Sequence, residues 1–416
     1  MQIQQIHSSV SAPQYSVSDP FIRDLSLLFP LHKLFKFLSL AMATGVNRKI
    51  YAASARSHTR RTKKTSSFQL PSGILRTTLA VLFIGFVAWA YQANRPPPPK
   101  ICGSPDGPPV TTARIKLRDG RYLAYREHGV PKDAAKYKII FVHGFGSSSH
   151  TSPVAESLSP AVVEDLGIYI VSFDRPGYGE SDPDPSRTLK SIAFDIEELA
   201  DKLGLGSKFY VTGLSMGGQI VWNCLKYIPH RLAGAALLTP VVNYWWRGLP
   251  ENLTTEAYYQ QKLRDQWALR VAHYTPWLTY WWNTQKWFPV ASAIGDVQGV
   301  LSNQDKLLVS KVTKRKSHVV HARQQGEFES LHRDINIGFG SWEYSPLDLE
   351  NPFPTNEGSV HLWQGDEDLL VPVTVQRHIA QNLPWIQYHE LPGSGHLFCL
   401  GDGISDTIIK SLLGVK

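Results

Sequence analysis

A serine flanked by two glycines stands where a strand pattern changes to a helix pattern. It lies in the pentapeptide GLSMG at positions 213–217, after the strand-like run 209–211 and before a helical stretch at 219–227. Glycines let the chain turn sharply, so this order predicts a nucleophile elbow that presents the Ser215 hydroxyl above the edge of a sheet. The pentapeptide alone fits an ordinary strand-to-helix turn equally well, and the partners of the serine decide between the two.

Two loops further along the chain offer the acid and the base that a reactive serine requires. A buried strand pattern at 360–363 runs into a turn with three consecutive acidic residues, 366–368, and a second strand pattern, 386–391, ends before His396. Loops at strand ends are where catalytic groups collect in α/β sheets. The serine needs a base to take its proton, and the imidazole needs a carboxylate to fix its tautomer. The order Ser, Asp, His differs from the chymotrypsin and subtilisin orders.

Two upstream strand patterns also end in glycine-containing loops. The apolar run 138–142 opens into HGFGS at 143–147, and the strand pattern 168–173 is followed by DRPGYGES at 174–181. With these four motifs in order, the region from about Ile115 to Leu413 resembles an α/β-hydrolase of the Ser-Asp-His type. The resemblance implies a mostly parallel sheet flanked by helices. A serine in the nucleophile position argues against the epoxide hydrolases and haloalkane dehalogenases of this fold, which use an aspartate there.

The resemblance also implies a role for several individual residues. The acidic turn is similar to the family pattern Gly-x-x-Asp-x-x-Val-Pro, which favours Asp368 over Asp366 as the third member beside Ser215 and His396. The backbone amides of Phe145 and Met216 are expected to form the oxyanion hole. Two further residues are expected to be structural: His143, which would hold its loop, and Asp174, which would brace the site.

Three longer runs narrow the resemblance. They are 325–334, 339–342 and 362–368, and they are similar to plant α/β-hydrolases that carry an N-terminal membrane segment and mostly have no defined substrate.

Charge is divided unevenly along the 416 residues, a length that suits two or three organised regions. The first 100 residues hold 13 basic and two acidic side chains, a net of +11, whereas the remaining 316 hold 30 basic and 33 acidic ones, a net of −3. No aromatic-interleaved platform accompanies the basic part, which disfavours nucleic-acid binding. Three cysteines give neither a disulfide framework nor paired metal-ligand spacing, and Cys224 is expected to be a small core residue.

An uncharged stretch of eighteen residues, Thr77–Asn94, lies between Arg76 and Arg95. As a helix it would reach roughly 27 Å, and a snorkelling Arg76 extends that to a bilayer core. Four prolines at 96–99 then stop the helix and form a stiff spacer. We expect a single membrane anchor here. A cleavable signal peptide would begin nearer the N-terminus, and a buried helix would not have a basic flank and a tetraproline as neighbours.

The location of the catalytic domain stays open between two expectations. Residues 48–76 carry eight Lys or Arg and no acid, so the positive-inside rule places the N-terminus in the cytosol and the domain in an endomembrane or ER lumen. The acid-free, Ser/Arg-rich composition of 43–73 also fits an organelle transit peptide, which would mean a chloroplast protein. The patch 31–40 fits either an amphipathic surface helix or a disordered leader. A sequon at 252–254 is usable only in a lumen.

A long insert precedes the acid-bearing strand. It spans 115 residues, 241–355, and its helical patterns at 255–287 and 305–318 predict a helical cap over the site. The cap holds eight of the twelve tryptophans: Trp245, Trp246, Trp267, Trp277, Trp281, Trp282, Trp287 and Trp342. They fit the cap's own core, because a small unit must bury large side chains. They also fit an apolar substrate tunnel or a surface that docks on the bilayer.

The expected organisation has five parts. They are a disordered basic tail (1–76), a transmembrane anchor (77–94), a Pro-rich linker (95–112), an α/β-hydrolase core (113–240 and 356–416) and the cap (241–355). The expected function is a membrane-anchored serine hydrolase that cleaves an ester, or a thioester or amide, of an apolar, lipid-like acyl compound, with no metal or organic cofactor. A small-molecule receptor or an acyltransferase on the same fold is the alternative, and the oligomeric state stays open.

Overall fold

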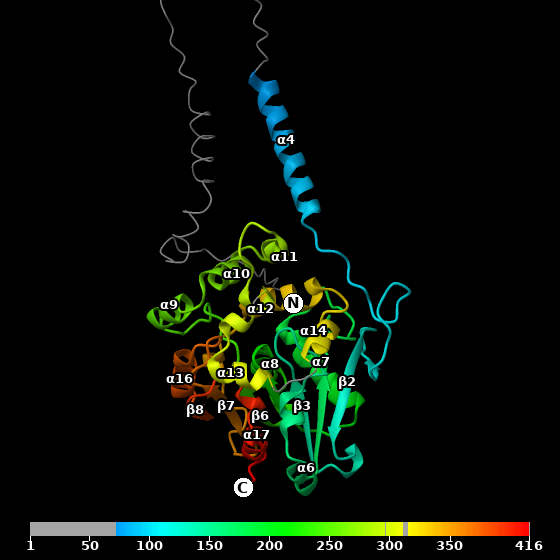
Figure 1. The fold of residues 1–416 in the computed structure, drawn as a ribbon, viewed down its shortest axis with the longest axis vertical. Coiled ribbons are helices and arrows are strands. Elements are labelled where there is room, and N and C mark those ends of the chain that lie inside the picture. The colour runs from blue at the N-terminus through cyan, green and yellow to red at the C-terminus, as the bar shows by residue number, and fades with distance from the viewer. Residues whose placement is uncertain (1–71, 296, 311–314, 416) are drawn as a thin grey trace, which may run out of the picture. The chain divides into compact units, whose positions relative to one another are not determined.

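A computed structural model describes residues 72–295, 297–310 and 315–415, so the expectations for the basic tail before residue 72 lie outside the described residues. An eight-stranded sheet runs through the described part in the order β1-β2-β4-β3-β5-β6-β7-β8 (Figure 1). The strands are β1 (Arg114–Lys116), β2 (Tyr122–Gly129), β3 (Tyr137–Val142), β4 (Ile168–Phe173), β5 (Phe209–Leu214), β6 (Leu232–Leu238), β7 (Val360–Gly365) and β8 (Ile386–Leu391).

The sheet is parallel from β4 to β8, and β2 runs antiparallel to both β1 and β4. Strands covered on both faces read as continuous apolar runs. Strand β4 follows this rule, because all six of its residues are buried. The predicted fold class, a mostly parallel sheet flanked by helices, is confirmed.

Helices cover both faces of this sheet (Figure 1). Alternate side chains such as Ile139, Phe141 and Ile170 form one core with residues of α5 and α17, and α8 packs on β3, β5 and β6 with α7 against it. The helices beside the sheet are α5 (Pro153–Ser157), α6 (Pro160–Leu166), α7 (Leu189–Lys202), α8 (Met216–Tyr227), α16 (Val373–Asn382) and α17 (Ile404–Leu413), with the short turns η1 (Lys132–Ala134), η2 (Pro229–Arg231) and η7 (Phe398–Leu400). This packing fixes the strand ends that carry the site.

The insert is helical, but its helices are shorter than the sequence pattern suggested. The pattern at 255–287 breaks between Tyr259 and Leu263, and again after Tyr274, where Pro276 lacks an amide proton and disfavours a helical residue before it. The elements of the cap are α9 (Glu251–Tyr259), α10 (Leu263–Tyr274), η3 (Pro276–Leu278), α11 (Thr279–Thr284), α12 (Ser292–Gly295), η4 (Val297–Val300), α13 (Asn303–Ser310), α14 (Arg315–Ala322), the π-turn η5 (Phe328–His332), α15 (Arg333–Phe339) and η6 (Pro346–Asp348).

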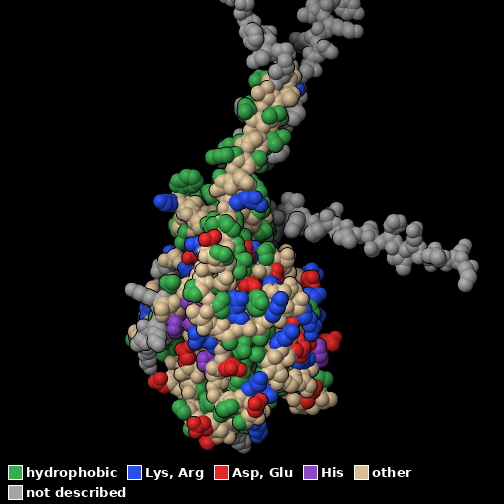
Figure 2. Space-filling model, turned by 90° about the vertical axis from the view of Figure 1, so that its right-hand side faces the viewer, with side chains coloured by type: hydrophobic (Ala, Val, Ile, Leu, Met, Phe, Trp, Pro, Cys, Tyr) green, Lys and Arg blue, Asp and Glu red, His purple; other side chains and the backbone are tan. Residues whose placement is uncertain are grey.

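A separate apolar helix, α4 (Ser72–Ala93), covers the segment predicted at 77–94 except its last residue, Asn94. Within it, Leu75–Ala93 is the one stretch of the described chain that is long and apolar enough to cross a membrane. Its large apolar side chains are exposed, as Figure 2 shows along this helix. After the prolines, the linker is fixed to the cap, because Lys100 N donates to Gln325 O (2.8 Å) and Cys102 N donates to Gln325 Oε1 (3.0 Å).

Candidate active site

Ser215 occupies a sharp turn between β5 and α8. Its backbone is in an unusual conformation for a non-glycine residue, with φ 58° and ψ −118°. A Cβ at Gly213 would lie 2.4 Å from the carbonyl oxygen of Gly217, and a Cβ at Gly217 would lie 2.1 Å from that of Val142. Only glycine fits at either position, which explains why the motif needs both. The strained backbone of Ser215 persists because the surrounding structure enforces it, as is common at functional sites.

His396 and Asp368 meet at the same edge of the sheet. The Nδ1 atom of His396 lies 2.8 Å from Asp368 Oδ2, and both side chains are buried. Asp368 is held in turn by the amides of Leu370 (2.8 Å) and Val371 (2.9 Å), which donate to Oδ1, and by the hydroxyl of Thr239, which donates to Oδ2. A carboxylate held this firmly fixes Nδ1 as the protonated ring nitrogen and leaves Nε2 as the acceptor.

The two groups move each other's pKa in opposite directions. Burial alone would raise the pKa of Asp368, but the neighbouring His396, the Thr239 hydroxyl and the Val371 amide hold it below its ordinary value. Burial alone would lower the pKa of His396, but Asp368 raises it above its ordinary value, with a smaller contribution from Asp305. Each shift favours the charged form of the pair.

The three acids of the turn differ in burial and contacts. Asp368 is buried against the imidazole, whereas Asp366 is half-buried and Glu367 is exposed. Asp366 Oδ1 accepts a long hydrogen bond of 3.4 Å from Ser394 N, which braces the histidine loop from outside. The geometry thus brings Asp368, and not Asp366, to His396.

A cavity of about 320 Å³ opens between this sheet edge and the cap, and both Ser215 and His396 line it. Phe145 and Met216, the residues predicted to supply the oxyanion amides, line the same space. Most other lining side chains are apolar, including Val242, Leu269, Leu301, Ile335 and Phe339. Among the described residues, no hydrogen bond joins Ser215 to His396, and catalytic contacts are often long without substrate. The cavity suits a compound with an apolar chain.

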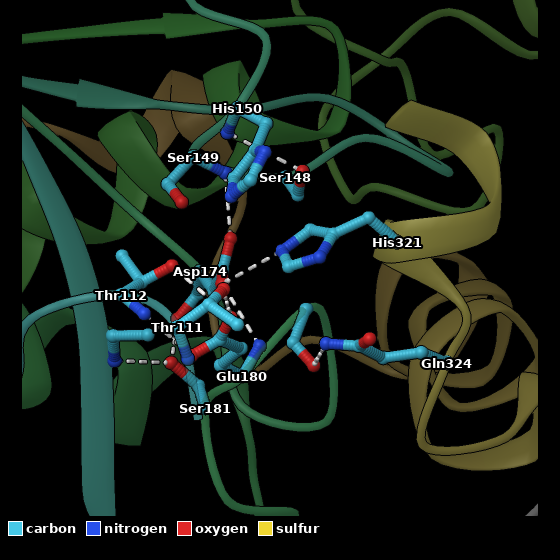
Figure 3. Close-up of polar contacts among 12 residues, drawn as sticks. Thr111, Thr112, Ser148, Ser149, His150, Asp174, Glu180, Ser181, His321 and Gln324 are labelled. Atoms are coloured by element: carbon cyan, nitrogen blue, oxygen red, sulfur yellow. Dashed lines mark hydrogen bonds and ion pairs between the residues drawn. The ribbon is translucent and has the colours of Figure 1, made fainter. Parts of the chain in front are cut away.

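His143 and Asp174 hold the loops around this cavity. The amide of Arg175 donates to His143 Nε2 (3.1 Å), so Nδ1 carries the proton and donates to the carbonyl oxygen of Gly144 (2.8 Å). Full burial, together with the Arg175 cation, lowers the pKa of His143 to about 3, so it stays neutral. Asp174 accepts from the amides of Ser149 (2.6 Å) and Glu180 (2.9 Å), as Figure 3 shows.

The cap contributes partners that sequence reasoning missed. His321 of α14 reaches to 3.9 Å from Asp174 Oδ2 and stacks on His150 of the core, with ring centroids 3.8 Å apart (Figure 3). Asp334 of α15 binds the buried guanidinium groups of Arg175 (2.7 Å) and Arg187 (2.9 Å). These pairs are more than 140 residues apart in the sequence, and no local pattern marks them.

The eight cap tryptophans divide by burial, and none of them lines the cavity in the described part of the chain. Trp246 is buried (5% exposed), Trp277 and Trp287 are exposed (66% and 78%), and the other five are half-buried. The tryptophans therefore do not form a tunnel wall at the cavity.

These features define a class. A Gly-x-Ser-x-Gly elbow and a buried His–Asp pair at the carboxyl edge of a mostly parallel sheet are the features of α/β-hydrolases. Residues 137–402 match the family described as alpha/beta hydrolase fold. Because this match covers more than half of the chain, the protein belongs to the α/β-hydrolase fold family, and membership supports hydrolase activity.

Individual relatives are distant. The chain is 21% identical over 299 residues to the "Probable lysophospholipase BODYGUARD 2" of Arabidopsis thaliana, a match that covers 67% of this chain and 58% of that relative. Among solved structures, the enol-lactonase from Burkholderia xenovorans LB400 is 17% identical with a TM-score of 0.50 and covers 72% of this chain and 100% of its own. A thermophilic esterase from Thermogutta terrifontis is 18% identical with a TM-score of 0.47, covering 73% and 99%. At these identities the structural likeness concerns the fold alone.

Proposed function

We propose that the protein is a membrane-anchored serine hydrolase that cleaves an ester of an apolar acyl compound, with Ser215, His396 and Asp368 as its triad. The observation that carries this proposal is the buried His396–Asp368 pair, 2.8 Å apart, which shares an apolar cavity with a strained Ser215. Pairing with Asp368 fixes the imidazole tautomer, and the acceptor nitrogen Nε2 is the atom that must take the serine proton.

The chemistry proceeds in two half-reactions. The Oγ of Ser215 attacks the ester carbonyl while His396 Nε2 takes its proton, and the amides of Phe145 and Met216 bind the oxyanion. The imidazolium then gives that proton to the departing alcohol, which leaves an acyl-enzyme on Ser215. Water repeats the attack with His396 as base, and the acid and free Ser215 are released. Asp368 stabilises the imidazolium in both halves.

The cavity lining and the relative support the proposed substrate class. An apolar space of about 320 Å³ favours a medium or long acyl chain over an acetyl group. The relative named as a probable lysophospholipase supports a lipid-like, single-chain ester as the candidate to test first.

The decisive test is covalent labelling of the full chain in detergent with a fluorophosphonate. Ser215→Ala should abolish labelling and ester turnover, whereas Ser147→Ala, which removes another serine of the cavity, should still be labelled. Turnover of a series of p-nitrophenyl esters and of a lysophospholipid should rise with chain length. Labelling without turnover would favour the receptor, and turnover only with an acceptor alcohol would favour the acyltransferase. Labelling that persists in Ser215→Ala would overturn the proposal.

The membrane part of the proposal rests on α4, whose apolar stretch Leu75–Ala93 is long enough to span a bilayer. The full chain should pellet with membranes and resist carbonate extraction. With the N-terminus in the cytosol, protease outside sealed microsomes should remove the tail and spare the hydrolase domain. Digestion of that domain would show that it faces the cytosol, and this orientation would exclude glycosylation of Asn252. A mature N-terminus after residue 70 would instead identify a transit peptide.

A further inference from the structure

The N-terminus of α13 in the cap reaches the loop that carries His396. It forms a capping box of its own, because Ser302 Oγ accepts from Asp305 N (3.1 Å) and Asp305 Oδ2 accepts from Ser302 N (3.1 Å). Boxes of this kind satisfy the free amides at the start of a helix and require nothing beyond the helix itself. Here the same carboxylate makes additional contacts outside α13.

Three consecutive amides of the histidine loop are bound by this helix end. Asp305 Oδ2 accepts from His396 N (3.0 Å), and Asp305 Oδ1 accepts from Leu397 N (2.7 Å). Next to it, Gln304 Oε1 accepts from Gly395 N (2.6 Å). The cap therefore fixes the backbone on both sides of the histidine side chain, and the ring orientation depends on that backbone.

Close approach of the cap explains the glycine before His396. A Cβ at Gly395 would lie 2.2 Å from Ser302 Oγ and 2.3 Å from Asp305 Oδ2, so any larger residue would displace α13. Gly395 has no positive φ that would itself demand glycine. Gly395 in the histidine loop therefore permits the close packing of α13 against that loop.

The charge of Asp305 is also unusual. Its side chain is fully buried, and within the described ranges no Lys, Arg or His forms an ion pair with it, so amide protons alone compensate the carboxylate. A buried anion acts strongly on nearby titrating groups. Its field adds to that of Asp368 and raises the pKa of His396. His396 thus contacts one carboxylate, that of Asp368, through its ring and a second, that of Asp305, through its backbone amide.

We propose that Asp305 is a positioning residue through which the cap orients His396 and stabilises its protonated form, so that a docked cap is a condition for full activity. This inference rests on the proposed function, since it assigns a helper to the same base. Gln304 supports the orientation alone, because it carries no charge.

The test compares three variants of the full chain in detergent. Asp305→Asn keeps the shape but removes the charge and one acceptor, and kcat should fall on the order of 10- to 100-fold, a size typical of a misplaced catalytic group, with KM changed less than about twofold. The acid limb of the kcat/KM profile should move to lower pH, because loss of the anion lowers the pKa of His396. Gln304→Ala should lower kcat without moving that limb. Asp348→Asn controls for the loss of a capping carboxylate, since Asp348 closes a capping box with Ser345 away from the cavity and, unlike Asp305, is exposed.

A second measurement keeps the outcome separate from that of the proposed function. Histidine ¹³C NMR of the full chain, with the His396 signal assigned by His396→Gln, gives the His396 pKa whether or not an ester is turned over. A lower pKa in Asp305→Asn than in the wild type supports the inference even if no substrate is found. If Asp305→Asn only lowers the melting temperature, as Asp348→Asn does, and leaves both the pKa and kcat unchanged, Asp305 is a helix cap and the inference is wrong.

Discussion

The core and the cap of this protein place their functional groups by different means. In the core, each group follows directly from its own strand: Ser215 follows β5, Asp368 follows β7 and His396 follows β8. In the cap, Asp305, His321 and Asp334 act by touching core loops that are distant in the sequence. The catalytic residues of the core therefore lie in short sequence motifs, whereas the cap residues act through tertiary contacts. A short motif can be recognised in the sequence, but a tertiary contact between distant residues cannot.

The largest expected effect tests the core. Asp368→Asn should lower turnover by roughly 10⁴-fold, because an amide leaves His396 in the wrong tautomer while its shape is kept. Steady-state kinetics on a soluble ester measures this loss. Asp366→Asn, two residues away in the same turn, should cost little, because Asp366 does not contact His396 and an amide oxygen can still accept the 3.4 Å bond from Ser394 N. The reverse ranking would transfer the role of the acid to Asp366.

The next effect tests the link between cap and core. Asp334→Asn removes the anion between two buried guanidinium groups, Arg175 and Arg187, and breaking such a pair costs about 3–5 kcal/mol of unfolding free energy. Denaturant unfolding measures the loss. As a control, Glu390→Gln breaks the partly exposed pair with Arg377 and should cost less than about 1 kcal/mol. Equal losses in both variants would show that the cap link is no stronger than a surface pair.

The same carboxylate gives the link a pH dependence. Burial would raise the pKa of Asp334, but Arg175 and Arg187 hold it below its ordinary value. A carboxyl with a depressed folded pKa contributes its stability above the unfolded pKa, which is about 4 for aspartate, and loses it as pH falls through the folded pKa. The wild type should therefore lose stability below about pH 4 more steeply than Asp334→Asn does. If the unfolding free energies of the wild type and Asp334→Asn fall in parallel below about pH 4, Asp334 does not cause this pH dependence.

The sequence predicted the parts of the molecule that local physics determines. Strands β4 and β8 have the predicted bounds: β4 is a run of six buried residues that starts directly after Gly167, and β8 ends two residues before Gly393. Gly213 is likewise explained by a close backbone contact within the elbow, to the carbonyl oxygen of Gly217, whereas Gly217 is required by the neighbouring strand end at Val142. The bond from His396 N to Asp305 joins residues 91 apart, and nothing in a helical pattern says which acid of a cap will meet which loop. Long-range pairing of this kind needs the folded coordinates.

The smallest expected effect is that of Trp287→Ala, and Trp246, another tryptophan of the cap, is its comparison. Trp287 is 78% exposed and lies away from the cavity lining, so Trp287→Ala should change the unfolding free energy by no more than about 0.5 kcal/mol. Trp246 is only 5% exposed and packs on Trp342, with ring centroids 5.0 Å apart, so Trp246→Ala should cost about 3–5 kcal/mol. Thermal and denaturant unfolding of the two variants in detergent gives both values. Turnover of a soluble ester should be unchanged in Trp287→Ala, because no group of the site depends on it. A large loss of stability in Trp287→Ala would mean that the cap buries this side chain in solution, and the division of the cap into packed and exposed tryptophans would fail.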